Sequence, residues 1–268
     1  MGETTGPTPQ AARARGEAGR LAVWLVVGAL VAVLAVGAGV WYFVFRDTAP
    51  AKVDIETAAE AARNDQSSST TTNGAATTTK NLDGTWKVNN EIGDFNVSTD
   101  TFTSSWVGYR VKEELSGIGA KTAAGRTPDV TGSLTIDGTT ATAATFTAQL
   151  TTLQSDDTRR DGQLRNQALQ TSQFPTATFT LTKPIAFGTV PADESTVKVD
   201  ATGDLTLHGV TKSVTIPLQA KVVGDTVVVT SLFDITFADF NIQKPQSVIV
   251  LSVEDKGQME LQLFFTKS

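Results

Sequence analysis

Cysteine is absent from this chain of 268 residues, and histidine occurs only once. Without cysteine there is no disulfide, no thiol nucleophile and no cysteine-ligated zinc or iron–sulfur site. The absence also excludes the acylated cysteine that holds a bacterial lipoprotein in its membrane. A single histidine excludes metal sites and catalytic motifs that need two imidazoles. We therefore expect neither a metal nor a tightly bound cofactor.

Positive charge is scarce as well. The chain has 22 Lys and Arg against 28 Asp and Glu, which gives a formal net charge of −6. A nucleic-acid-binding surface needs clustered Lys and Arg to displace the counterions of the phosphates. The composition therefore predicts no nucleic-acid partner.

Two short segments are similar to ligand-binding loops, but neither keeps the essential residues. Segment 117–122, GIGAKT, resembles the end of a phosphate-binding loop, yet Leu115 and Ala120 stand where that motif needs glycine. Segment 157–168 resembles a calcium loop, yet Arg159 replaces a ligand and Ala168 replaces the closing glutamate. Neither nucleotide nor calcium binding is expected.

The one imidazole, His208, lies between Leu207 and Gly209. A histidine at a strand end before a glycine turn is more often a hydrogen-bonded structural residue than a catalytic one. An isomerase or hydrolase function would depend on His208 and scattered aspartates alone. We therefore predict that the protein is not an enzyme.

One long apolar run is present. Leu21–Phe45 contains no charged residue, and Arg20 and Arg46 flank it. At about 1.5 Å per residue a helix of this length measures roughly 37 Å, enough to cross a hydrocarbon core of about 30 Å. Trp24 and Trp41 lie near its two ends, as interfacial aromatic residues do. A cleavable signal peptide is the alternative, but its apolar core usually ends after about 7–15 residues. We predict an uncleaved transmembrane helix.

The flanks of this span predict its orientation. Residues 1–20 are polar and read as a disordered cytoplasmic segment. Arg13, Arg15 and Arg20 precede the span, whereas Arg46 and Lys52 follow it. The excess of positive charge before the span places the N-terminus in the cytoplasm and the rest of the chain outside.

Residues 46–81 are rich in Ala, Ser and Thr and are predicted to be a tether. The tract Ser67–Thr72 cannot bury apolar area and is typical of a flexible spacer. A short helix over Asp54–Arg63 is compatible with the composition, but a peptide of this length is marginal alone. Such a spacer would hold a folded domain away from a membrane.

The folded domain is predicted over residues 82–268, where two-residue alternation replaces helical periodicity. Phe179 and Leu181 alternate with threonines, and a longer run extends from Val199 to Leu207. Turn signals such as Asp137-Gly138 separate the strands. The pattern predicts a mainly β domain, an antiparallel barrel or sandwich of about eight or more strands with one apolar face.

One short helix interrupts the strands between Ser155 and Pro175. Leu164, Ala168 and Leu169 have helical spacing, and Asp161 is predicted to cap the start of the helix. We expect this helix to lie across one end of the barrel.

Aromatic residues are spread across the domain, and two interpretations of them remain open. They either fill an ordinary core or line a central space. A barrel of about eight strands is just wide enough to hold one small apolar ligand. Periodicity does not separate a filled barrel from a hollow one, because both require the same alternation.

Several segments, taken in order, resemble the YceI-like family. The strongest is GDLTLHGVTKSVTIP at 203–217, followed by RRDGQLRNQALQTSQFPTATF at 159–179. GTWKV at 84–88, SSWVGYRVKEEL at 104–115 and VTGSLTIDG at 130–138 complete the set. The resemblance covers essentially 84–268 and leaves out the predicted span and tether.

The resemblance implies an exported, lipocalin-like antiparallel barrel of eight strands. Family members are described as binding a long isoprenoid chain, such as a polyprenyl quinone, in an apolar tunnel. By the same resemblance, Tyr109 is the early aromatic residue, Phe174 and Phe179 flank the helix-to-strand passage, and His208 is the Leu-His-Gly histidine. Many members carry a histidine where this chain has Lys112-Glu113-Glu114, so a headgroup contact there is not expected.

The predicted function is that of a membrane-tethered, extracytoplasmic binding protein for an isoprenoid lipid, located in the cell envelope. The alternative is a ligand-free envelope module that acts through its surface. The predicted ligand-binding residues are Tyr109, Phe146, Leu150, Phe174, Phe179, Leu205, His208 and Phe237.

Overall fold

The computed structural model describes residues 31–37, 49–68, 81–192, 194–245 and 250–268. The chain divides into two compact units, Met1–Asp47 and Thr48–Ser268. In the first unit residues 31–37 are helical and exposed. Within the described ranges, no helix has the length and apolarity needed to cross a bilayer. Most of the predicted span, Leu21–Phe45, lies outside the described residues.

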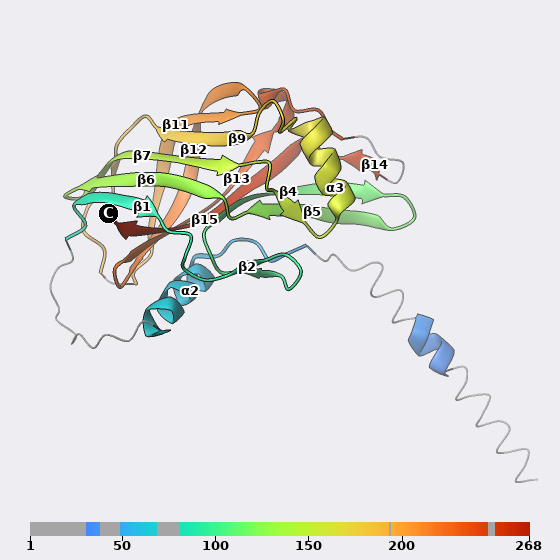
Figure 1. The fold of residues 1–268 in the computed structure, drawn as a ribbon, viewed down its shortest axis with the longest axis horizontal. Helices are drawn as coiled ribbons and strands as arrows, with labels where there is room; N and C mark the ends of the chain where they lie inside the picture. The colour runs from blue at the N-terminus through green and yellow to red at the C-terminus, as the bar shows by residue number, and fades with distance from the viewer. Residues whose placement is uncertain (1–30, 38–48, 69–80, 193, 246–249) are drawn as a thin grey trace, which may run out of the picture. The chain divides into compact units, whose positions relative to one another are not determined.

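Eight antiparallel strands of the second unit form a closed barrel (Figure 1). Each strand pairs with its neighbour in the order β1-β6-β7-β9-β11-β12-β13-β15, and pairing of β1 with β15 closes the ring. The predicted eight-stranded barrel is therefore confirmed. Its strands are β1 (Gly84–Val88), β6 (Val130–Asp137), β7 (Thr140–Gln149), β9 (Thr176–Leu181), β11 (Val197–Leu207), β12 (Val210–Val223), β13 (Thr226–Thr236) and β15 (Lys256–Lys267).

Further strands extend the wall of the barrel beside β15. One edge of β15 pairs with β13 along almost its whole length. The other edge is shared: residues 258–262 of β15 pair with β4, and residues 265–267 of β15 pair with β1. A separate two-stranded sheet of β2 and β3 lies in the connection from β1 to β4. The remaining strands are β2 (Phe95–Asn96), β3 (Thr101–Phe102), β4 (Trp106–Leu115), β5 (Gly119–Thr127), β8 (Gln154–Ser155), β14 (Val250–Val253) and β10 (Ile185–Ala186), of which β10 pairs with β7.

Alternation along each strand places apolar side chains inside the barrel and threonines outside. In β11, Ala201, Gly203, Leu205 and Leu207 are buried, and the three residues between them are more exposed. On the outer surface Thr202 and Thr215 join hydroxyls across the β11–β12 pair at 3.0 Å. Such cross-strand pairs add stability without using the interior.

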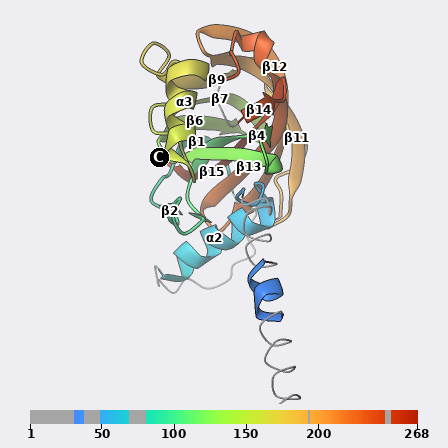
Figure 2. The same cartoon turned by 90° about the vertical axis from the view of Figure 1, so that its right-hand side faces the viewer.

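Helix α2 (Ile55–Ser68) packs on the outside of the barrel rather than belonging to a free tether (Figure 2). Asp54 begins it, because its carboxylate accepts hydrogen bonds from the N–H groups of Glu56 and Thr57 at 3.0 Å. The tether prediction for 46–81 is therefore wrong for residues 49–68. It failed because the apolar face of α2 consists mainly of alanines, which composition alone does not distinguish from a spacer.

A second helix, α3 (Thr158–Gln163), continues into the π-helical turn η1 (Leu164–Ala168). Its N-cap is Asp157, which accepts from the N–H groups of Arg159 and Arg160. Asp161, the predicted cap, is instead buried and accepts hydrogen bonds from the N–H and hydroxyl of Ser155. A short 3-10 helix, η2 (Phe237–Phe240), follows β13.

Candidate functional site

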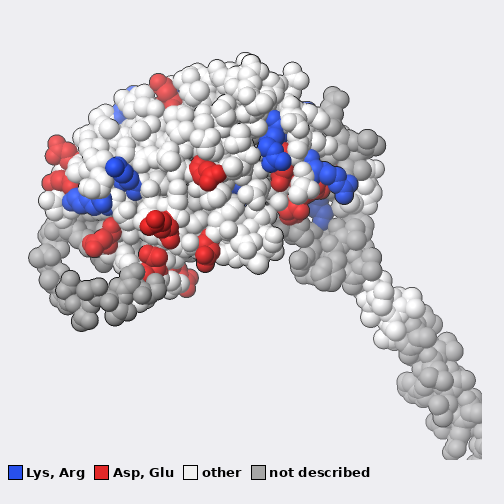
Figure 3. All heavy atoms as spheres, in the orientation of Figure 1, with Lys and Arg blue, Asp and Glu red and all other residues white. Residues whose placement is uncertain are grey.

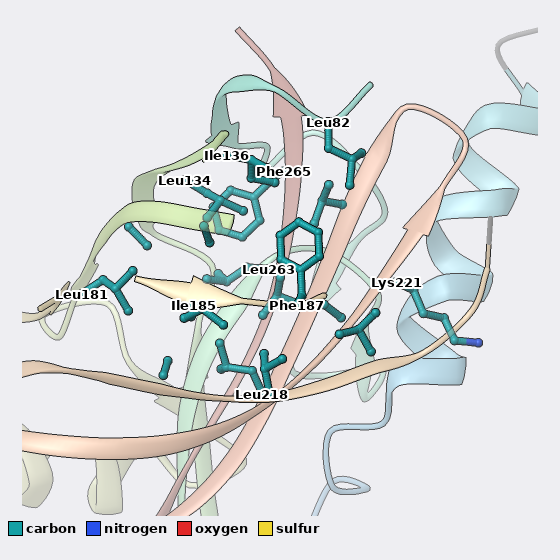
Figure 4. Close-up of a pocket in the computed structure, with 18 of the residues that line it drawn as sticks. Leu82, Leu134, Ile136, Leu181, Ile185, Phe187, Leu218, Lys221, Leu263 and Phe265 are labelled. Atoms are coloured by element: carbon teal, nitrogen blue, oxygen red, sulfur yellow. The ribbon is translucent and has the colours of Figure 1, made fainter. Parts of the chain in front are cut away.

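The interior of the barrel contains a large cavity with an entirely apolar wall. Its volume is about 110 Å³, and residues from β6, β7, β9, β11, β12, β13 and β15 line it. Figure 4 shows Leu134, Phe187 and Leu263 among its lining residues, whereas the amino group of Lys221 points away toward α2. Since no polar atom faces this first cavity, only an apolar group can occupy it without losing hydrogen bonds to water.

A stacked pair of phenylalanines narrows the interior beyond the first cavity. The ring centroids of Phe146 and Phe179 lie 5.1 Å apart with an interplanar angle of 19°. Both rings also line a connecting cavity of about 20 Å³. One water-sized sphere needs roughly 10–15 Å³, so the connecting cavity has room for only about one such sphere. The Phe179 ring lies against the backbone of Gly203. Only glycine leaves room for it, because a Cβ atom at position 203 would collide with the ring.

A second large cavity, of about 120 Å³, follows the connecting one. Val107, Ala177 and Met259 line both, just as Phe146 and Phe179 line both the first and the connecting cavity. The three cavities therefore lie one after another along the barrel interior, and this row of cavities is called the tunnel here.

The second cavity differs from the first in having polar residues in its wall. They include Glu113, Arg160 and Lys244, beside Tyr109. Both cations are already paired: Arg160 with Glu113 at 3.3 Å and with Asp156 at 2.5 Å, and Lys244 with Asp255 at 2.7 Å. The tunnel thus has one wholly apolar end and one end with charge-neutralised polar groups.

Tyr109 carries the hydroxyl group of greatest interest in the second cavity. Its Oη atom is buried and has no hydrogen-bond partner among the described residues. Burial raises the pKa of Tyr109 far above its ordinary value, although the nearby Arg160 guanidinium opposes the shift. The phenol therefore stays neutral. A buried unpaired hydroxyl costs roughly 1–3 kcal/mol, which a ligand that accepts its hydrogen bond would recover.

His208 lies in a hairpin turn, Phe174 packs against that turn from the loop before β9, and neither is in the tunnel wall. His208 and Gly209, with φ of 50° and 73°, form the two-residue loop between β11 and β12. The carbonyl of Phe240 accepts a hydrogen bond from His208 Nδ1 at 3.1 Å, and the Phe174 ring meets the imidazole edge-on at 4.6 Å. Within the described chain, Nε2 has no partner. This arrangement agrees with the structural interpretation of His208.

The eight residues predicted from the sequence fall into two groups. Six line the tunnel: Phe146 and Phe179 in the first and connecting cavities, Leu205 in the connecting one, and Tyr109, Leu150 and Phe237 in the second. Phe174 and His208 are not among the lining residues. The prediction missed Leu134 and Ile136, which the alternation in VTGSLTIDG could have indicated, and Phe187, which no periodic pattern marks.

The face shown in Figure 3 has no large patch of a single charge. Lys, Arg, Asp and Glu are scattered there over a mostly uncharged surface. A search of the described residues for groups of three or more metal-ligating side chains finds none. The tunnel is thus the feature of the barrel that offers a binding site.

Comparison with known proteins places this fold in a family. The YceI-like domain matches residues 67–265 of the chain. The protein belongs to the YceI-like family. One curated relative, Protein YceI of Escherichia coli O6:H1, is 36% identical over 123 residues, which cover 45% of this chain and 57% of the relative. The chain therefore spans less than two thirds of the curated relatives that it matches.

Two solved structures are similar to part of this chain. One is a polyisoprenoid binding domain from Saccharophagus degradans, with 16% identity and a TM-score of 0.48, covering 61% of this chain and 94% of that one. The other is BcnA of Burkholderia cenocepacia, with 21% identity and a TM-score of 0.47, covering 64% and 99%.

Proposed function

We propose that this YceI-like barrel binds an isoprenoid lipid, a polyprenyl quinone or a similar amphiphile, in its tunnel and performs no catalysis of its own. The observation that carries the proposal is the row of three cavities with an apolar wall at one end. An isoprenoid tail has no polar group to satisfy, and burying its surface contributes roughly 25 cal/mol per Å². The resemblance to the family supports the same ligand class.

The tail occupies the first and connecting cavities, and the headgroup lies in the second. Tyr109 offers an unused neutral donor there, which suits the carbonyl of a quinone. A phosphate headgroup would need free cations, whereas Arg160 and Lys244 already have carboxylate partners. Specificity in such sites comes from a few polar groups around an apolar body. The proposed headgroup is therefore uncharged.

The barrel works outside the cytoplasm, attached to the membrane. The support is the uncharged run Leu21–Phe45, with Arg13, Arg15 and Arg20 before it. In this position the protein retains, and shuttles, a lipid that has almost no solubility in water.

The test is native mass spectrometry of the purified full chain, followed by lipid extraction, on wild type and two variants. Phe179→Asp places a charge in the tunnel, and we expect it to abolish lipid retention. Thr180→Asp is the matched control, because the neighbouring side chain on β9 is exposed, and it should keep the lipid. Circular dichroism verifies that both variants fold.

A stoichiometric adduct with an isoprenoid mass series in wild type and in Thr180→Asp supports the proposal. Equal lipid content in a folded Phe179→Asp variant contradicts the tunnel assignment. A clean ligand-free mass after incubation with quinones and polyprenols would favour the surface-acting envelope module instead.

A further inference from the structure

The segment of residues 49–68, called here the docked segment, is bound to the barrel by its backbone. The carbonyl of Pro50 accepts a hydrogen bond from Arg110 Nη1 at 2.7 Å, and the carbonyl of Ala51 accepts one from Arg126 Nη2 at 2.6 Å. The N–H of Val53 donates to Glu260 Oε2 at 3.3 Å. Its residues therefore attach to the wall formed by β4, β5 and β15.

These contacts satisfy a buried group of charges. Arg126 Nη2 lies 3.0 Å from Glu260 Oε1, Arg110 Nη1 lies 3.6 Å from the same oxygen, and the side chains are 4%, 8% and 0% exposed in the order Arg126, Arg110, Glu260. Two guanidinium groups face one carboxylate, so one positive charge is in excess. The carbonyls of the docked segment complete the hydrogen bonds of that excess charge, which burial otherwise makes costly.

The helical part of the docked segment adds apolar contacts. Ala58, Ala59 and Ala62 are fully buried in a cluster with Val228 and Phe264. Polar contacts border this cluster. Lys221 donates to Glu56 at 2.6 Å, Arg63 to Glu194 at 2.8 Å, and Gln66 to the carbonyl of Val223 at 2.8 Å. Burial of this kind distinguishes a docked element from a flexible spacer.

The docked segment is an addition to the family domain. The family match begins at residue 67, after almost all of the segment. Yet the segment contacts β4, β5, β12, β13 and β15 through the bonds given above.

We propose that the docked segment holds the barrel close to the lipid bilayer surface, by reducing the connection from the membrane span to residues 46–49. This inference rests on the proposed span Leu21–Phe45. At about 3.3–3.6 Å per residue, the chain from Phe45 to Pro50 covers at most roughly 18 Å, whatever its conformation. A free tether over 46–81 would have a root-mean-square length of about 30–36 Å and a much greater maximum.

The short connection changes how a lipid reaches the tunnel. A barrel on a long spacer must carry its ligand through water or a wall layer. A barrel joined to the span by a connection of at most roughly 18 Å meets the bilayer surface more often, so the ligand passes between bilayer and tunnel at high effective concentration. The partner of this part of the molecule is thus the lipid bilayer surface.

Two insertions test the proposal without removing any contact of the barrel. Twenty Gly–Ser residues after Asp47 lengthen the connection in front of the docked segment by about 25 Å root-mean-square. The same insertion after Gly74 lies behind the docked segment and is the matched control. If residues 46–81 were a free tether, both insertions would lengthen the connection between span and barrel. If the segment is docked, only the insertion after Asp47 lengthens that connection.

The measurement is energy transfer in phosphatidylcholine vesicles that contain a headgroup-labelled acceptor lipid. The chain has no cysteine, so the full-length Ser213→Cys variant carries a single donor label at an exposed site. We expect efficient transfer without insertion and with the Gly74 insertion, and a severalfold lower transfer with the Asp47 insertion. Equal loss from both insertions, or no loss from either, overturns the proposal.

Hydrogen exchange on the same full-length protein separates the two ways to fail. Protected α2 amides with no transfer in any variant would mean that the segment is docked but that the proposed membrane span is wrong. Unprotected α2 amides would refute the docking itself. Lipid retention by the tunnel is measured in a separate experiment, and neither of these results would contradict it.

Discussion

At the scale of single residues, Tyr109 is the group whose chemistry the barrel leaves unused. Its hydroxyl is buried without a partner among the described residues, and burial keeps it neutral. The paired states of Arg160 and Lys244 remove the competing cations. Tyr109 is therefore the residue most able to distinguish one headgroup from another.

Tyr109→Phe removes this hydroxyl and keeps the ring. We expect the affinity for a polyprenyl quinone to fall about 2- to 13-fold, since one neutral hydrogen bond contributes roughly 0.5–1.5 kcal/mol. The affinity for a polyprene of equal length without a headgroup should not change. Competition between the two ligands, read by native mass spectrometry, measures the ratio. An unchanged ratio would exclude Tyr109 from headgroup recognition.

Tyr109 also predicts an alkaline dependence of stability. Its pKa is raised in the folded state, so the folded protein holds the phenolic proton more tightly than the unfolded chain does. This contribution is complete below the ordinary pKa near 10 and is lost as pH rises above it. Urea unfolding at pH 9 and pH 11 should show a smaller loss of stability in Tyr109→Phe than in wild type. Parallel losses in both proteins would contradict the assignment.

At the scale of elements, α3 shows that a capping residue cannot be identified from the local sequence without its tertiary contacts. Asp157 and Asp161 both precede or begin a helical pattern, and either can serve as a cap. The structure uses Asp157 as the cap because the Asp161 carboxylate is bonded to Ser155 at the end of the barrel. The helix thus begins at the residue that the packing leaves available.

Asp157→Ala should destabilise the protein by about 1 kcal/mol at neutral pH, the usual cost of losing an N-cap. Partial burial tends to raise the pKa of Asp157, but hydrogen bonds from the N–H groups of Arg159 and Arg160 outweigh it and lower the pKa. The contribution is therefore present above the ordinary pKa near 3.9 and is lost as pH falls through the lowered pKa of the folded state. Denaturant unfolding of variant and wild type should show a smaller stability difference at pH 2 than at pH 7. A difference of the same size at pH 2 would exclude the charged cap.

At the scale of the whole molecule, closure of the barrel encloses the tunnel. Pairing of β1 with β15 removes the sheet edges that an open antiparallel sheet would expose. The interior of the closed barrel is neither completely filled by side chains nor open as one large cavity. It consists of two cavities of about 110 and 120 Å³ with the Phe146–Phe179 stack between them.

A bound lipid should therefore stabilise the entire barrel. Removal of the lipid by organic extraction lowers the melting temperature, and readdition of a polyprenyl quinone restores it. A ligand at 100 times its dissociation constant adds about 2.7 kcal/mol to the free energy of unfolding. Differential scanning calorimetry of the full chain before and after extraction gives the shift. An identical melting temperature in the two states would contradict a tunnel occupied by ligand.

Much of the site could be predicted from the sequence, and the rest could not for identifiable reasons. Phe179 and Leu205 follow from alternation, because a period of two decides which side chains point inward. Phe187 lies in a loop where no period applies, so only the packed structure brings it to the tunnel. The family resemblance predicts His208 and Phe174 as site residues, whereas the structure has His208 in the β11–β12 turn and Phe174 packed against it, outside the tunnel wall.

The sequence by itself determined a mainly β, antiparallel domain and the absence of cysteine chemistry, because alternation and composition are local properties. The closed barrel of eight strands was implied by the family resemblance, because alternation is the same in a barrel and in a sandwich. Only the tertiary structure decided that the barrel encloses a tunnel, since filled and hollow barrels share one pattern. It also decided that α2 is docked. The stability of such a short alanine-rich helix comes from contacts with Val228 and Phe264, far away in the sequence. Local sequence patterns determine which segments become strands and helices, and contacts between distant residues determine whether cavities remain between them.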